Sequence, residues 1–93
     1  MPYTFREWYV PERMMGAIWR YIHQGTPPGD FLTAVIENNL CEALGRADDE
    51  NLKNLPAFLA YFYNEAPGEC WGSPEKRRVW VNTFTEGQES SLE

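Results

Sequence analysis

Four breaks rich in proline, glycine or helix-capping acids divide this 93-residue chain into stretches whose apolar residues recur at helical spacing. The breaks are Pro27-Pro28-Gly29, Asp48-Asp49-Glu50, Ala66-Pro67-Gly68 and Ser73-Pro74. Proline fits only the first turn of a helix, and glycine tolerates the left-handed conformation that ends one. The breaks therefore predict a soluble all-α domain, a small bundle of about four helices.

Apolar stripes predict the first two helices. Residues 11–24 begin with proline at the first helical position and end before Gly25, and their expected buried stripe is Met15, Ile18, Trp19 and Ile22. The second helix is expected to open at Gly29 or Asp30 and to end at Gly45. The residues expected on its buried face are Leu32, Val35, Ile36, Leu40 and Ala43 or Leu44.

The second half of the chain predicts an interrupted third helix and a capped fourth helix. Asp48 is a good N-cap, and Pro56 disfavours an uninterrupted helix, so we expect a short turn over 48–54 and a helix over about 55–65. The expected buried stripe of the whole third helix is Leu52, Leu55, Leu59, Phe62 and Ala66, with Phe58 beside it. Ser73 before Pro74 predicts a helix over about 74–84, with Val79, Trp80 and Phe84 facing inward.

Composition predicts one domain followed by a polar tail. Hydrophobic residues make up 43% of the chain and aromatic residues 15%, which is enough for one compact core. We expect residues 1–84 to form a single helical domain and residues 85–93 a disordered tail, whose last two residues are a cloning remnant. Cys41 and Cys70 have no disulfide framework around them, so we expect free thiols.

The net charge of −6 is concentrated in the middle of the chain, where residues 29–70 hold eight acidic and two basic residues. This argues against direct binding of nucleic acid, which requires clustered Lys and Arg. The one basic cluster, Lys76-Arg77-Arg78, is expected to be a solvated helix face. The chain has no apolar run of membrane-spanning length and no signal peptide, so we expect a cytoplasmic protein without membrane contact.

The sequence contains no convincing set of catalytic or metal-binding residues. His23 is the only histidine, and neither cysteine has a neighbour in sequence that favours the reactive thiolate. These residues cannot form a four-ligand zinc site, and the acidic triplet at 48–50 lacks the spacing of a calcium loop. Phosphate-binding glycine motifs are absent. We therefore expect no enzymatic activity, no cofactor and no metal.

Aromatic residues indicate where the protein would contact a partner. The first ten residues carry a partly alternating aromatic run, which is either an arm that completes the core or an exposed patch that binds a partner or a second copy of the chain. Aromatic residues also flank the loop before the last helix, where they either plug the end of the bundle or anchor a binding surface. The candidate contact residues are Tyr3, Phe5, Trp8, Tyr9, Tyr63 and Trp71.

Four motifs resemble a group of small uncharacterised proteins encoded by phages, prophages and related mobile elements. They are PPGDFLTAV at 27–35, RAD at 46–48, YNEAP at 63–67 and WGSPEK at 71–76, and the resemblance covers about residues 12–82. It brings no catalytic residues with it. It implies a setting in which short accessory proteins commonly act by binding a host or phage macromolecule.

These observations favour a non-enzymatic protein-interaction module of mobile-element type, with a homodimer as one form of that interaction. Two alternatives remain open. The acidic residues of the second helix and of Asp48-Asp49-Glu50 would allow the protein to mimic nucleic acid and occupy a basic DNA-binding protein. An aromatic pocket between helices would instead make it a carrier of a small apolar ligand.

Overall fold

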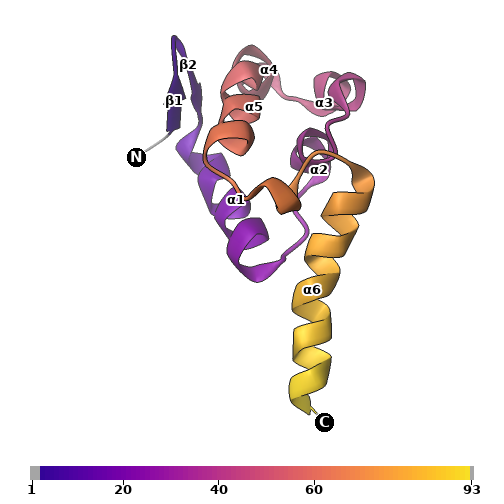
Figure 1. Ribbon diagram of the computed structural model, residues 1–93. Helices are drawn as coiled ribbons and strands as arrows, with labels where there is room; N and C mark the ends of the chain where they lie inside the picture. Colours follow the sequence, from indigo (N-terminus) through magenta and orange to yellow (C-terminus); the bar gives the residue numbers. More distant parts are fainter. Residues whose placement is uncertain (1–2, 93) are drawn as a thin grey trace.

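The computed structural model describes the backbone of residues 3–92 and the side chains of residues 3–85. Over these residues the chain forms a β-hairpin, six α-helices and one short 3-10 helix (Figure 1). The elements are β1 (Tyr3–Phe5), β2 (Trp8–Val10), α1 (Glu12–Gln24), α2 (Asp30–Ile36), α3 (Leu40–Arg46), α4 (Asp49–Lys53), α5 (Leu55–Asn64), η1 (Gly68–Cys70) and α6 (Pro74–Leu92). The fold is mostly helical, as predicted, but the expectation of an all-α chain was wrong.

The N-terminal aromatic run forms an antiparallel hairpin in which Phe5 pairs with Trp8. The two residues between them form the turn, and Arg6 adopts the left-handed conformation, with φ of 56°, that tight hairpin turns favour. Both strands pack against α5, and Val10 is completely buried. The run therefore completes the core, although three-residue strands are too short to give a clear alternation in the sequence.

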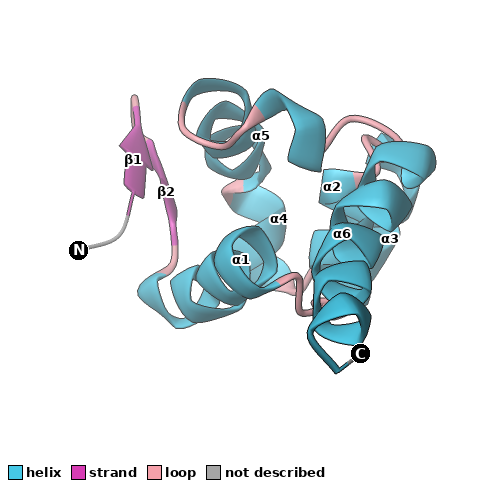
Figure 2. Ribbon diagram, turned by 60° about the horizontal axis from the view of Figure 1, so that its bottom comes forward, coloured by secondary structure: helices cyan, strands magenta, loops and turns pink. Residues whose placement is uncertain are grey.

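Helix α5 lies at the centre of the core. Phe58 and Phe62 are fully buried, and the ring of Phe58 meets the ring of Phe31 from α2 edge to face at 5.0 Å. The hairpin covers one side of α5, and α2 and α4 also contact it. Figure 2 shows the hairpin at one end of the molecule and α2, α3 and α6 at the other, with α1, α4 and α5 between them.

The predicted second helix is two helices, so its expected end at Gly45 was wrong. Asn38 takes a left-handed φ of 60°, which ends the helical conformation after α2. The Asn39 side chain then caps α3 by accepting a hydrogen bond from the Glu42 N–H. Gly45 lies inside α3. Asparagine tolerates the left-handed region and is a favoured N-cap, so the Asn-Asn pair is the physical cause of the break.

Most of the other predicted helix boundaries agree with the structure. Helix α1 matches the expected 11–24, and the short turn before a restart near Pro56 corresponds to α4 and α5. Asp48 and Ser73 accept the predicted capping hydrogen bonds from Asn51 N–H and Lys76 N–H. Helix α6 continues past the expected end at residue 84 to Leu92, and the predicted tail falls largely on residues whose side chains lie outside the described part of the chain.

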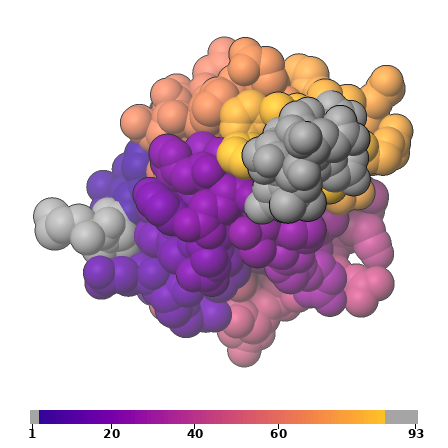
Figure 3. All heavy atoms as spheres, turned by 90° about the horizontal axis from the view of Figure 1, so that it is seen from below, coloured from indigo at the N-terminus to yellow at the C-terminus, as the bar shows by residue number. Residues whose placement is uncertain are grey.

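Helix α6 is fastened to the body by three side chains on one face. The Arg77 Nε lies 2.6 Å from a Glu37 carboxylate oxygen, the Trp80 indole donates to the Tyr21 carbonyl, and Phe84 packs on Gly25. Viewed from below, the atoms around residue 20 lie beside those of α6 (Figure 3). The expectation that Arg77 belongs to a solvated basic face was therefore wrong, because this guanidinium is mostly covered and paired with Glu37.

Several apolar residues that were expected in the core lie on the surface. The exposed ones are Trp19, Leu40, Leu44, Leu52 and Val79. On α1 the buried face is rotated, so that Tyr21 is buried between Ile18 and Ile22 while Trp19 lies against His23. Leu40 and Leu44 face outward because the break at Asn38 turns α3 relative to α2.

Gly25 is the glycine whose replacement is expected to cost most. It ends α1 with a φ of 67°, and an added Cβ would lie under 3 Å from the side chain of Phe84. Gly25→Ala should therefore lower the free energy of unfolding by roughly 2 kcal/mol or more. The control Gly45→Ala has open space around the new methyl group and should raise it by about 0.5–1 kcal/mol. Equal effects of the two changes in urea titrations would contradict this account.

Candidate functional site

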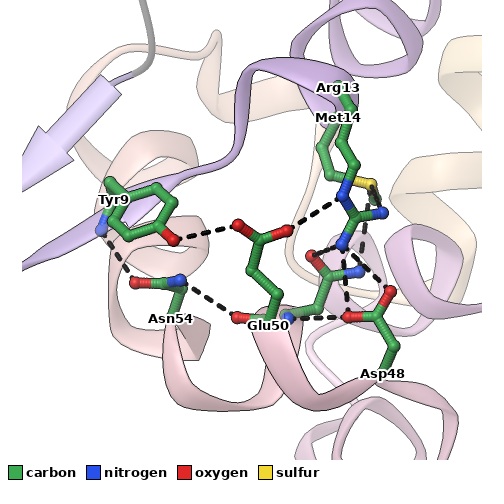
Figure 4. Close-up of polar contacts among 7 residues, drawn as sticks. Tyr9, Arg13, Met14, Asp48, Glu50 and Asn54 are labelled. Carbon is green, nitrogen blue, oxygen red and sulfur yellow. Dashed lines mark hydrogen bonds and ion pairs between the residues drawn. The ribbon is translucent and has the colours of Figure 1, made fainter.

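A cluster of polar side chains joins β2, α1 and α4, and Glu50 lies between Tyr9 and Arg13 in it (Figure 4). The Arg13 guanidinium donates to the Glu50 carboxylate at 3.0 Å and to the Asp48 carboxylate at 3.0 Å. The other Glu50 oxygen accepts from the Tyr9 hydroxyl at 2.9 Å. We call Tyr9, Arg13, Asp48, Glu50 and Asn54 the Arg13 cluster.

The Arg13 cluster also aligns the hairpin. The Asn54 side chain is almost fully buried, accepts from the Tyr9 backbone N–H and donates to the Glu50 carbonyl. Tyr9 lies in the middle of β2, so this contact satisfies an outward-facing N–H of the hairpin. Tyr9 was predicted to contact a partner, but the structure uses both its hydroxyl and its backbone N–H within the fold.

Titration of this cluster points to a structural role. Hydrogen bonds from Tyr9 and then from Arg13 lower the pKa of Glu50, while the Asn51 N–H and the Arg13 side chain lower the pKa of Asp48. A general acid or base at neutral pH requires the opposite shift for a carboxyl group. The carboxylates are held ionised and paired, and all five residues have partners within the fold.

No group of histidine, cysteine, aspartate and glutamate among the described residues could hold a metal ion. The two thiols are free: Cys41 is exposed on α3, and Cys70 is buried in η1. Burial raises the pKa of Cys70 to about 11, so its thiol is protonated at neutral pH. Its backbone carbonyl accepts a hydrogen bond from the Tyr21 hydroxyl at 2.6 Å, and this contact connects η1 to α1.

The strongest candidate site is an open apolar depression over α5, which we call the α5 hollow. It has a volume of about 600 Å³ and lies among four parts of the fold: β1, the break between α2 and α3, the outer side of α5, and the segment after η1. Its lining residues are Phe5, Asn38, Pro56, Leu59, Ala60, Tyr63, Asn64 and Trp71. None of them is charged, and Tyr63 is 78% exposed.

The structure brings three of the six predicted contact residues together at the α5 hollow. Phe5, Tyr63 and Trp71 come from β1, α5 and the segment before α6, yet all three line this depression. Trp71 is half-buried against Phe62, with ring centroids 6.0 Å apart, so the core fixes its position.

The two remaining predicted contact residues, Tyr3 and Trp8, belong to the hairpin and do not line the α5 hollow. The Tyr3 ring meets the Tyr61 ring edge to face at 5.2 Å, and the Trp8 ring stacks near Phe5 at 6.5 Å. Both are partly buried against the core. Trp8 therefore packs beside Phe5, and Tyr3 contacts α5 through Tyr61.

Sequence reasoning missed the remaining lining residues, Asn38, Pro56, Leu59, Ala60 and Asn64. A signal was present in residues 55–63, which contain no charged or amide side chain over more than two helical turns. A helix that is apolar on all sides needs cover on all sides. The described neighbours of α5 leave Tyr63 uncovered.

A second depression of about 650 Å³ lies between η1 and the start of α6. Its lining includes Glu69, Glu75 and Lys76, and the Lys76 ammonium approaches the Gly68 carbonyl. Charged side chains of both signs at its edge are typical of an ordinary solvated surface. The α5 hollow, with its uncharged aromatic lining, is the better candidate for a contact site.

No family profile, curated protein or solved structure matches this chain. Among the described residues, no helix combines the length and apolar character that a membrane span requires.

Acid should weaken the Arg13 cluster. Asp48 and Glu50 have lowered pKa values in the folded protein, so their stabilisation is present at neutral pH and is lost as the pH falls below about 4. Arg13→Gln should therefore lower the melting temperature at pH 7, and the difference from the wild type should shrink near pH 3. Circular dichroism melts would measure this, with Arg20→Gln on the same helix as the control. A difference that is the same at both pH values would contradict it.

Proposed function

We propose that this protein is a non-enzymatic interaction module that binds a protein partner through the α5 hollow. The observation that carries the proposal is the convergence of Phe5, Tyr63 and Trp71 on one uncharged depression. Exposed apolar patches mark interaction sites on soluble domains, and aromatic side chains are enriched among the residues that contribute most to binding.

The chemistry of the described residues supports a binding role over a catalytic one. The titratable groups that lie closest together, in the Arg13 cluster, are paired with one another and have carboxyl pKa values shifted away from neutral pH. The α5 hollow contains no titratable group other than the Tyr63 phenol. The resemblance of four sequence motifs to mobile-element proteins implies a setting in which short accessory proteins commonly bind a host or phage macromolecule, which agrees with such a role.

Mimicry of nucleic acid is less well supported by the geometry. That role needs a row of unpaired carboxylates, but Asp48 and Glu50 are paired with Arg13, and Asp30 and Glu37 are paired with Arg46 and Arg77. Each pair reduces the negative charge that a basic partner would meet.

Capture experiments would test the proposed contact surface. Tyr63→Ser removes the most exposed residue of the α5 hollow and should leave the fold intact, because the side chain is 78% exposed. When each tagged protein is used as bait in a lysate of its own cells, the amount of partner captured by the variant should be about one tenth of the wild-type amount or less. Because the contact is apolar, the wild type should keep its partner at high salt.

Trp19→Ser is the matched control for this capture. Trp19 is also an exposed aromatic residue, at 53%, but it lies on α1 and does not line the α5 hollow. Its replacement should leave the captured partner unchanged. Loss of the partner with Trp19→Ser and retention with Tyr63→Ser would place the contact surface elsewhere and overturn the proposal.

A carrier of a small apolar ligand is the second candidate, because the volume of the α5 hollow falls within the range of ligand pockets, about 300–1,000 Å³. If it is correct, some members of a panel of small apolar compounds should raise the melting temperature of the wild type and of Leu44→Glu, which lies outside the hollow. They should not stabilise Leu59→Glu, which places a charge in the lining. A flat response of the wild type would exclude this candidate.

A further inference from the structure

We propose that the partner bound at the α5 hollow is a second copy of this chain, and that Tyr63 of each copy inserts into the hollow of the other. This inference rests on the proposed role of the hollow as a contact surface. It adds the identity of the partner and the residue that enters the depression.

The first argument is shape. Tyr63 lies at the edge of the α5 hollow and is 78% exposed, so a projecting aromatic ring and the depression that could receive such a ring occupy the same face. A two-fold dimer requires a self-complementary patch, in which residue i contacts residue j and residue j contacts residue i. A projection beside a depression meets this requirement, because a two-fold rotation places each projection over the opposite depression.

The second argument is charge. The chain carries a net charge of −6, so two copies repel one another over most orientations. None of the eight residues that line the α5 hollow is charged, so two copies that meet there place no like charges opposite one another within the lining. A basic partner would gain no charge pairing from this lining, which favours a second copy over a partner of opposite charge.

The third argument is hydrogen bonding at the edge of the hollow. Asn38 and Asn64 are exposed, and their side-chain amides make no hydrogen bond within the described part of the chain. An amide both donates and accepts, so it can pair with the same amide across a two-fold axis. The edge of the hollow therefore offers self-complementary polar groups around an apolar centre, which is the usual anatomy of an interface.

Sedimentation equilibrium of the purified protein would test the proposal. A small face of this kind should give a weak dimer, so the average mass should rise from one to two copies between about 10 µM and 1 mM. Tyr63→Ser should weaken dimerisation at least about tenfold, and the control Trp19→Ser should leave it unchanged. Added salt should strengthen the dimer, because it screens the repulsion between the acidic copies. A wild type that stays monomeric, or dimers unaffected by Tyr63→Ser, would overturn the proposal.

Mixing two variants would test the insertion itself. Tyr63→Ser lacks the projecting ring but keeps the other seven lining residues of the depression, whereas Leu59→Lys places a charge in the depression but keeps the projecting ring. Neither variant should dimerise alone, but an equal mixture can form one of the two Tyr63 contacts and should give heterodimers by native mass spectrometry. A mixture that associates no better than either variant, with Leu59→Lys shown to be folded by its melting transition, would rule out reciprocal insertion.

The results separate this proposal from the proposed function. If the pure protein is monomeric while Tyr63→Ser still loses a different captured protein, the contact surface stands and the second copy is excluded. If the pure protein dimerises but Trp19→Ser disrupts the dimer and Tyr63→Ser does not, both proposals fail.

Discussion

Burial of the aromatic side chains of α5 is the constraint on which the rest of the fold depends. Phe58 and Phe62 are completely covered, and the hairpin, α2 and α4 all pack against this one helix. Burying a phenylalanine side chain contributes about 1.5–3 kcal/mol, a large share of the net stability of a small domain. Because the helix is apolar on nearly all sides, three short elements cannot cover it completely, and the α5 hollow is the part that they leave open.

Polar contacts determine how these elements are aligned, since apolar burial has no direction of its own. Asn54 connects the hairpin to the start of α5, and Arg13 connects α1 to α4 through two carboxylates. At the opposite end, the Arg77–Glu37 ion pair and the Trp80 indole place α6 against α2 and α1. These polar contacts involve residues other than those that line the hollow.

The sequence predicted the parts of the fold that depend on local rules. The caps at Asp48 and Ser73, the restart near Pro56 and the end of α1 at Gly25 follow from the conformational limits of single residues. Features that depend on tertiary packing were missed. The rotation of α1 that buries Tyr21 and exposes Trp19, and the outward turn of Leu40 and Leu44, are decided by neighbours that no local pattern reveals. For the site, residue type identified Phe5, Tyr63 and Trp71, but only the fold could bring them to one place.

Three of the four tryptophans of the chain provide a direct test of the central claim, that the α5 hollow is the contact surface. Trp71 lines the hollow, Trp19 is exposed on α1, and the Trp80 indole N–H on α6 donates a hydrogen bond to the Tyr21 carbonyl. Their indole N–H signals can be compared between ¹⁵N-labelled protein in buffer, at a concentration below the range of about 10 µM to 1 mM in which the chain is expected to pair with itself, and the same protein in a lysate of its own cells. The account predicts that the Trp71 signal shifts or broadens while those of Trp19 and Trp80 stay in place. An unchanged Trp71 signal with a perturbed Trp19 or Trp80 would contradict it.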